Sequence, residues 1–306
     1  MRSRETAKRL WRRVFEAGQR LKLDVLPRHF YSEIPDIRLL RRESAWKRPF
    51  TMVGIQGVAV AEQLQFLVEC CTPEITERLR TARIHADACE EAGSDGYGSV
   101  EAEMLYAFIR NKRPSHIFQI GCGVSTAVIL RAAKDAGYVP RLQCVEPYPT
   151  GYLKAREREG SLQLITSKAQ TVDNSIVETL PEQAFFFVDS SHTLGPTGEV
   201  SRIILEFLPR LKTGSWIHFH DIYFPYDYDR HILKESLFFP HESALLHAYL
   251  VQNSHVRLCA ALSMLHYRAS RELQRLLPAY QPATDDEGLE VAPGQFPSAT
   301  YLSVVQ

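Results

Sequence analysis

The sequence predicts an α/β fold in which a mainly parallel sheet carries helices on both faces. From about residue 117 onward, short apolar runs alternate with helix-like segments, which is typical of parallel sheets. The first run leads into the turn Gly121, Cys122, Gly123, and a helical pattern follows at once. Acidic and histidine residues follow later runs, where the carboxyl ends of parallel strands place ligand sites.

The first 98 residues are predicted to form a helical and extended cap region, separate from an α/β domain over residues 99–306. Leu10, Trp11 and Val14 recur with helical spacing, and a proline-containing extended segment follows them. Helices are expected at 5–21, 58–71, 73–92 and 100–111.

Seven strands are expected in the rest of the chain, with the last one antiparallel at the edge of the sheet. The expected strands are 117–120, 142–146, 162–166, 184–189, 215–220, 255–262 and 299–305. The expected helices between them are 125–136, 150–158, 171–179, 196–211, 229–251 and 267–276. Residues 279–298 are rich in proline, glycine and acids and are predicted to be a loop.

The composition is that of an ordinary soluble protein, with 45% hydrophobic and 24% charged residues among 306. No apolar run reaches the length that a transmembrane helix needs, and no signal peptide is evident. The six cysteines form no Cys-x-x-Cys motif, so we expect reduced thiols in a cytoplasmic protein.

Charge is unevenly distributed along the chain. Residues 1–48 contain fourteen Lys and Arg against six acids, while the whole chain is neutral. Such a basic arm could bind nucleic acid or an acidic membrane, but no base-reading motif accompanies it. We therefore expect it to dock on the acidic body through Leu10, Trp11, Val14 and Phe15. The expected partner is a small-molecule acceptor, without nucleic acid or membrane, and a homodimer is compatible with the sequence.

The glycine turn favours a nucleoside ligand. Twenty-three residues after Gly123, a second strand ends at Glu146, where a carboxylate could bind ribose hydroxyls. The dinucleotide fingerprint would need glycine at position 126, which is Thr126. The pattern Gly-x-Gly-x-Ser/Thr with a later Glu resembles the first two motifs of class I S-adenosylmethionine (SAM) methyltransferases, so SAM is favoured over NAD.

Two further strand ends carry Asp189, His192, His220 and Asp221, which we expect to meet because their strands should be neighbours. Strand-end aspartates often cap loops, and paired histidines often lie satisfied in a core. Four ionisable groups at one place instead favour a catalytic role, with a histidine as general base. The same four side chains could hold Mg²⁺, Mn²⁺ or Fe²⁺.

Five segments together resemble a bacterial family of SAM-dependent methyltransferases with DSSH and HxHD signatures, the Methyltransferase-24-like proteins. They are FYSEIPD, GYGSVEAEMLYAFIR, QIGCGVST, FFFVDSSH and HFHDIYFPYDY, within about residues 25–270. The resemblance implies a Rossmann-like class I methyltransferase fold. It implies SAM binding by Gln119, Gly121, Gly123, Ser125, Glu146 and Asp189. Gln119 stands where many class I enzymes carry an acid that helps hold the methionine amino group.

The expected function is therefore methyl transfer from SAM to an oxygen or nitrogen of a small molecule. The positions of Asp189 and Asp221 also resemble the metal-binding carboxylates of catechol-type O-methyltransferases. Two alternatives stay open: a SAM enzyme that performs cyclisation or aminocarboxypropyl transfer, and a non-catalytic SAM-fold partner subunit.

Overall fold

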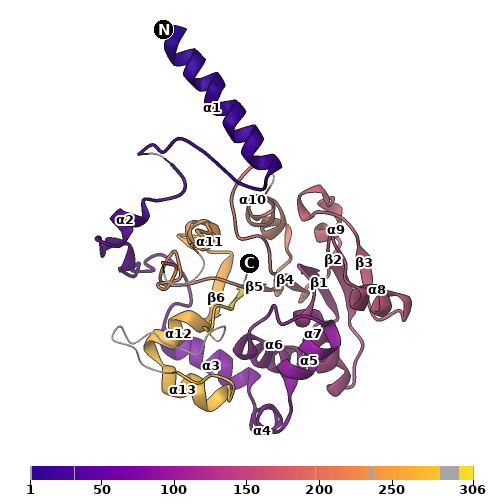
Figure 1. Ribbon diagram of the computed structural model, residues 1–306. Helices are drawn as coiled ribbons and strands as arrows, with labels where there is room; N and C mark the ends of the chain where they lie inside the picture. Colours follow the sequence, from indigo (N-terminus) through magenta and orange to yellow (C-terminus); the bar gives the residue numbers. More distant parts are fainter. Residues whose placement is uncertain (1, 31, 197, 234–236, 283–295, 306) are drawn as a thin grey trace. The chain divides into compact units, whose positions relative to one another are not determined.

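The computed structural model describes residues 2–30, 32–196, 198–233, 237–282 and 296–305 (Figure 1). It divides into two compact units, Met1–Trp46 and Lys47–Gln306, which we describe separately. Of the described helices, none combines the length and the apolar character that crossing a membrane requires.

The first unit contains little besides helices and extended chain. It comprises α1 (Arg2–Arg20), α2 (Ile37–Leu40) and the short helix η1 (Ala45–Lys47), which ends at the boundary between the units. The carboxylate of Asp36 caps α2 by accepting a hydrogen bond from the Arg38 amide at 2.8 Å. The helix predicted at 5–21 is thus confirmed as α1.

The second unit is built on one seven-stranded sheet, and all seven predicted strands are present. They are β1 (His116–Ile120), β2 (Arg141–Val145), β3 (Gln163–Ile165), β4 (Phe185–Val188), β5 (Trp216–Phe219), β6 (Val256–Ala261) and β7 (Thr300–Val304). Their order is β3-β2-β1-β4-β5-β7-β6, and β1 to β5 are parallel. The carboxyl ends of β1, β4 and β5 therefore lie side by side, as the sequence predicts.

The antiparallel direction of the last strand is confirmed, but the strand lies inside the sheet and not at the predicted edge. β7 pairs antiparallel with both β5 and β6 and lies between them, so β6 takes the outermost position. This arrangement brings the end of the chain beside β5, one of the strands whose polar ends carry the candidate site.

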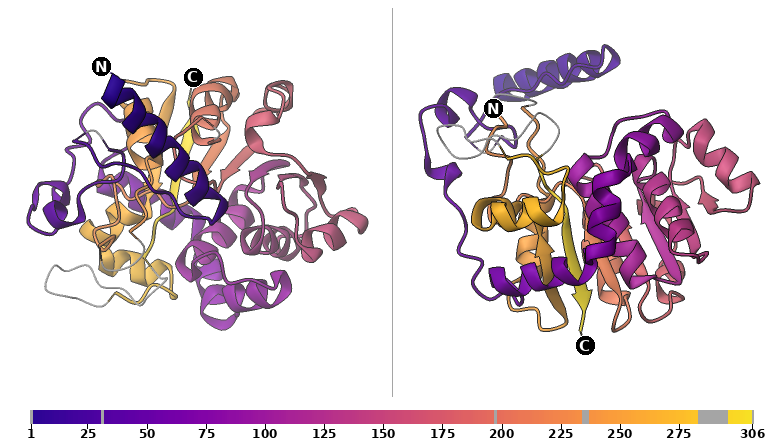
Figure 2. Two further views of the ribbon diagram at one scale, coloured as in Figure 1. Left: turned by 45° about the horizontal axis from the view of Figure 1, so that its top comes forward. Right: turned by 90° about the horizontal axis from the view of Figure 1, so that it is seen from below.

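Helices cover both faces of the sheet (Figure 2). Alternate residues of β4 serve the two faces: Phe185 and Phe187 join one hydrophobic cluster, whereas Phe186 and Val188 join the other. The first cluster includes residues of α3 (Val60–Cys70), α4 (Pro73–Thr81), α5 (Ile84–Ala92), α6 (Ser99–Lys112), α7 (Val124–Asp135), α8 (Gly151–Arg158), α12 (Leu262–Arg268) and α13 (Ser270–Leu276). The second includes residues of η2 (Ala169–Thr171), α9 (Ser175–Glu178), α10 (Val200–Arg202), η3 (Ile203–Phe207), η4 (Leu208–Arg210) and α11 (Glu242–Leu250).

Several helix boundaries differ from the prediction. Among the described residues of the helix expected over 229–251, only α11 is helical, and Pro240 cannot continue a helix from the residues before it. The helix expected at 73–92 is broken at Arg83, whose ψ of 61° lies outside the helical region. Most of the loop expected at 279–298 lies outside the described residues.

The predicted division into a cap region over residues 1–98 and an α/β domain over residues 99–306 stays a prediction. In the structure, α3, α4 and α5 belong to the second unit, where α3 packs on α6 and β6 and α5 packs on α7. They cover the face of the sheet that belongs to the first hydrophobic cluster and are part of the α/β body.

Candidate active site

The turn after β1 requires a glycine and lies against β4. Gly121 has a φ of 78°, which side chains disfavour, and a Cβ there would come within 1.9 Å of the backbone oxygen of Asp189. The Asp189 amide also donates to the carbonyl of Ile120 at 2.9 Å. The lack of a side chain at Gly121 is therefore what allows the ends of β1 and β4 to meet.

The side chain of Gln119 stabilises this turn through hydrogen bonds. It is fully buried, and its Nε2 donates to the Gly121 carbonyl at 3.0 Å and to Ser125 Oγ at 2.9 Å. Its Oε1 accepts from Thr126 Oγ1 at 3.0 Å, and that hydroxyl in turn accepts from the Gly123 amide at 3.1 Å. Both amide hydrogens of Gln119 are thus engaged by the protein. Gln119 and Ser125, expected to bind cofactor, are placed to support the turn.

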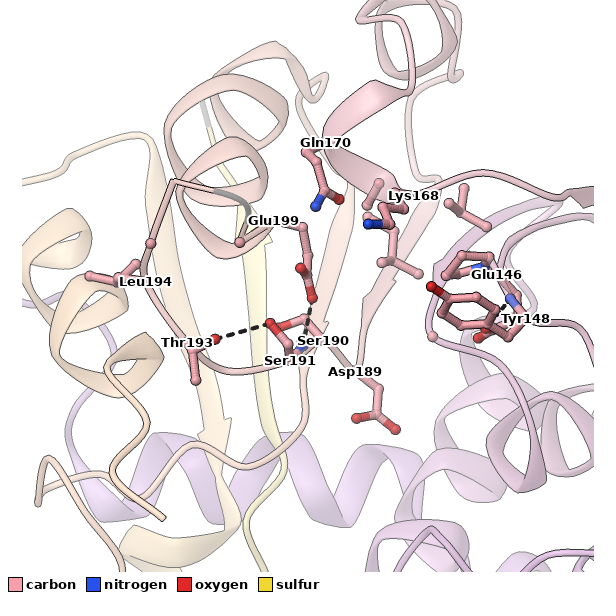
Figure 3. Close-up of a pocket in the computed structure, with 17 residues that line it drawn as sticks. Glu146, Tyr148, Lys168, Gln170, Asp189, Ser190, Ser191, Thr193, Leu194 and Glu199 are labelled. Carbon is pink, nitrogen blue, oxygen red and sulfur yellow. Dashed lines mark hydrogen bonds between the residues drawn. The ribbon is translucent and has the colours of Figure 1, made fainter. Parts of the chain in front are cut away.

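Glu146 lies across the pocket from Asp189 (Figure 3). Its Oε1 accepts from the Tyr148 amide at 2.9 Å and its Oε2 from the Cys122 amide at 3.4 Å, so two backbone groups fix the half-buried carboxylate. Each oxygen keeps a lone pair for a further donor. Gly123 has nothing within 4 Å of the position that a Cβ would take, which leaves this side of the turn open.

The pocket between these groups has a volume of about 510 Å³, within the range of small-molecule sites. Its lining comes from residues 120–121, 145–148, 168–170, 189–191, 193–195 and 198–199. In Figure 3, Glu146 and Tyr148 lie on one side, and Ser191 and Glu199 on the other. Glu199 accepts a hydrogen bond from the Ser191 amide at 2.6 Å, which fixes the loop after β4.

His192 lies among three carboxylates. Its Nδ1 is 2.7 Å from Oε2 of the fully buried Glu242, and its Nε2 is 3.7 Å from Asp189 Oδ1 and 3.5 Å from Asp221 Oδ2. Ser190 Oγ donates to the other oxygen of Glu242 at 3.0 Å. Asp189 therefore belongs both to the pocket and to this ion-pair cluster.

His220 and Asp221 complete the cluster at the end of β5. His220 Nε2 is 3.8 Å from Asp221 Oδ1, and among the described residues its buried Nδ1 has no hydrogen-bond partner. Ser298 Oγ donates to Asp221 Oδ1 at 2.9 Å, and the Ser298 amide donates to the buried Glu101 at 2.7 Å. The structure thus brings together all four side chains that the sequence singles out, and the roles predicted for them stay predictions.

The charges set the protonation of the two histidines. Burial acts to lower the pKa of His192, but the hydrogen bond and charge of Glu242, with Asp221 and Asp189, raise it to about 9. Burial likewise acts to lower the pKa of His220, and the carboxylates of Asp221 and Asp189 outweigh it, so that pKa is raised too. His192 is therefore an imidazolium at neutral pH and is not available as a general base.

The pKa values of the Asp189 and Asp221 carboxyl groups are shifted in opposite directions. Burial raises the pKa of Asp189 against the opposing charges of His220 and His192. For Asp221 burial also acts to raise the pKa, but the two histidines outweigh it and the pKa is lowered. Asp221 is thus the firmly ionised member of the pair.

Two backbone positions in the cluster are in the left-handed region. His192 has a φ of 60° and Asp221 a φ of 54°, conformations that cost free energy for residues with a side chain. Ser190 Oγ accepts from the His192 amide at 3.1 Å, and Ser298 fixes Asp221 from outside β5. The surrounding contacts hold both side chains where they face one another.

These side chains do not fit the predicted metal site. Among the described residues, no group of three or more His, Cys, Asp or Glu side chains is arranged to hold a metal ion. His192 Nδ1 is engaged by Glu242, and its Nε2 lies 3.7 Å from Asp189 Oδ1 and 3.5 Å from Asp221 Oδ2, so these side chains pair with one another. We therefore assign no step to a metal.

Other residues of the segment HFHDIYFPYDY pack inside the protein. His218 is fully buried, stacks on Phe187 at 4.4 Å between ring centroids, and has its Nε2 3.3 Å from the Tyr97 hydroxyl. Burial lowers its pKa well below the usual value, so it stays neutral. In the aromatic segment after β5, Phe224 is buried and makes an edge-to-face contact with His247, with 5.8 Å between ring centroids.

Sequence reasoning missed Glu242, Ser298 and Glu101. Glu242 begins α11, fifty residues after His192, inside a segment predicted to be mid-helix. Its only local signal is an acid just after Pro240, at the start of a helix. Ser298 lies at the end of the long loop, and nothing in its neighbours indicates that it reaches β5.

Two comparisons of sequence relate the chain to known proteins. Residues 118–222 match a family model described as "Methyltransferase domain". An uncharacterised protein of Archaeoglobus fulgidus is 30% identical over 187 residues, which cover 58% of this chain and 80% of that protein. The matched residues of the family model run from β1 to just past β5, so they include every strand end of the site.

Solved structures give more distant similarities. The SAH-bound methyltransferase PaMTH1 of Podospora anserina is 15% identical, with a TM-score of 0.41, over 92% of this chain and 99% of that one. The plantazolicin methyltransferase BamL, in complex with a triazolic desmethylPZN analog and SAH, is 13% identical, with a TM-score of 0.40, over 80% and 96%. No conclusion about this chain's substrate is drawn from either.

Proposed function

The chain belongs to one family with the Archaeoglobus fulgidus protein and is a SAM-dependent methyltransferase, and from this premise we propose that it methylates an oxygen or nitrogen of a small-molecule acceptor at the His192 and His220 cluster. One observation carries the proposal. Asp189 lines the pocket of Gly121 and Glu146 and is also an ion-pair neighbour of His192. A cofactor in the pocket and an acceptor at the cluster would meet at this carboxylate.

The pocket fits SAM by the hydrogen-bond acceptors that it offers. Glu146, fixed by two backbone amides, has lone pairs for the two ribose hydroxyls. The open side of Gly123 leaves room for the amino-acid end over the turn. Bound SAM supplies an electrophilic methyl group on a cationic sulfonium. The excess of carboxylates at Asp189, Asp221 and Glu242 favours a cation beside them.

The cluster supports different roles for its two histidines. His192, protonated between three carboxylates, offsets part of their negative charge and keeps them in place. His220 directs Nε2 toward Asp221 and, among the described residues, keeps Nδ1 without a partner. His220 is therefore the group that takes the proton from the acceptor as the new bond forms. Asp221, which stays ionised, orients His220 and stabilises its charged form.

The experiment that tests the proposal identifies the products. The protein is titrated with SAM by calorimetry, with NAD as the comparator, and then incubated with SAM and a panel of small phenols, carboxylic acids and amines. We expect SAM binding and release of S-adenosylhomocysteine together with one methylated acceptor. Binding of NAD in place of SAM contradicts the cofactor assignment. Release of methylthioadenosine shows cyclisation or aminocarboxypropyl transfer and contradicts methyl transfer.

A further inference from the structure

Helix α1 has an apolar face that its own unit leaves uncovered. Val14 lies four positions after Leu10 and three after Trp11, so the three side chains share one face of the helix. Their exposed fractions are 62%, 45% and 37%, and Phe15, half-buried, continues the stripe. Figure 1 shows α1 as one unbroken helix, so the stripe is continuous.

The rest of the helix surface is strongly basic. Between residues 7 and 20, the side chains Lys8, Arg9, Arg12, Arg13 and Arg20 face a single acid. That acid, Glu16, is paired with Arg12 at 2.8 Å. The cations lie on the flanks and the back of the apolar stripe. With 3.6 residues per turn, Arg9, Arg13 and Arg20 project from the side opposite the stripe, and Lys8 and Arg12 project beside it.

The first unit has no core that could receive the stripe. Within the described part of residues 7–46, the only buried residue is Gly18, which has no side chain. Further exposed apolar side chains follow α1: Leu21, Leu23, Val25, Leu26, Phe30, Ile34 and Leu39. So many exposed apolar groups beside a basic face indicate a surface that is covered by something else.

We propose that α1 binds along the surface of an anionic phospholipid membrane, with Leu10, Trp11 and Val14 inserted at the level of the headgroups. Such a surface satisfies both faces at once: acyl chains cover the stripe, and lipid phosphates meet the arginines. The ring of Trp11 suits the polar–apolar boundary. The helix is too polar to cross a membrane, so it lies on the surface. The sequence alone predicts docking on the acidic body, whereas the exposed stripe and the lack of a core in the first unit favour a lipid surface.

The full-length protein is tested by co-sedimentation with vesicles of phosphatidylcholine alone and of phosphatidylcholine mixed with phosphatidylglycerol. We expect it to sediment with the anionic vesicles and to be released as salt rises. The double variant Leu10→Gln with Val14→Gln keeps every charge, and glutamine is a good helix former. We expect its affinity for the anionic vesicles to be lower by roughly tenfold or more. Val139→Gln, which replaces an exposed valine of the second unit, is the matched control and should bind as the wild type does.

Three outcomes overturn the proposal. One is failure to sediment with anionic vesicles at low salt. Another is equal sedimentation of the double variant and the wild type. The third is a wild type that does not bind vesicles together with a double variant that differs from it in elution volume or has a lower thermal midpoint. That outcome would place the stripe against the chain's own body or a second copy. None of these measurements depends on the methyltransferase activity, so they separate this proposal from the proposed function.

Discussion

Glu242 Oε2 lies 2.7 Å from His192 Nδ1, in a place where the carboxylate has no exposed surface at all. The contact joins the start of α11 to the loop after β4, and Ser190 adds a hydrogen bond to the other carboxylate oxygen. Removing one member of a buried pair leaves the other charge uncompensated, which costs more than the pair contributes. The position of His192 beside Asp189 therefore depends on a residue far away in the chain.

Glu242→Gln removes this negative charge and keeps the size of the side chain. We expect the pKa of His192 to fall from about 9 and the free energy of unfolding to drop by on the order of 3 kcal/mol near neutral pH. NMR titration of the imidazole and urea denaturation measure the two effects. An unchanged pKa of His192 would show that Glu242 does not control it.

The pH dependence of this variant has a defined sign. The folded pKa of His192 is raised above its usual 6.5, so its stabilising contribution is fully present below 6.5 and is lost as pH rises through about 9. The stability difference between wild type and Glu242→Gln should thus be largest near pH 6 and shrink by about pH 10. A difference that grows between these pH values contradicts the pairing.

Glu146→Ala tests the ribose site. We expect the Kd for SAM to rise roughly tenfold or more, because the carboxylate would accept two hydroxyl hydrogen bonds. Calorimetry with SAM measures it, and Glu182→Ala, an exposed glutamate away from the pocket, is the matched control. Equal affinities for the two variants would remove Glu146 from the cofactor site.

Gly121→Ala and Gly123→Ala separate folding from binding. At Gly121 the new Cβ would overlap the Asp189 backbone at a positive φ, so the thermal midpoint should fall by several degrees or more. At Gly123 nothing in the protein lies within 4 Å of the new Cβ. Gly123→Ala should therefore lose much less stability and still weaken SAM binding, if the cofactor lies over the turn. Full affinity in Gly123→Ala would contradict that pose.

The sequence predicts the features that depend on residues close together in the chain. The run into Gly121, the helix after it and the later strands are local patterns, and they fix the order of β1, β4 and β5 through the rules for parallel sheets. The convergence of Asp189, His192, His220 and Asp221 follows from that order. The contacts of Glu242 and Ser298 depend on chain segments that meet only in the folded protein, so no local sequence pattern predicts them. The imidazolium state of His192 is a consequence of those contacts, so sequence reasoning could not assign it.

Glu103 provides a pH-dependent prediction outside the active site. Burial raises its pKa from 4.5 to about 7, although its Oε2 accepts the Ala279 amide at 2.8 Å. A raised folded pKa means that the wild type loses stability as pH rises from 4.5 through about 7, by about 3 kcal/mol. Glu103→Gln keeps an acceptor for Ala279 and should flatten this part of the stability curve. Urea midpoints at pH 5 and pH 8 measure it, and an unchanged slope would show that Glu103 ionises freely.

His220→Asn is the test of the general base. We expect turnover to fall by roughly a hundredfold, the usual scale for a lost base, with the Kd for SAM changed by no more than about threefold. A base works only when deprotonated, and the pKa of His220 is raised above 6.5, so wild-type turnover should increase with pH through a value higher than that of free histidine. The variant should lack this rise. His247→Asn alters a half-buried histidine that contacts Phe50 and Phe224 edge to face, outside the cluster, and should keep both the rate and the profile. If His220→Asn retains the wild-type pH profile, the acceptor's proton goes elsewhere and Asp189, whose pKa is also raised, becomes the base to test.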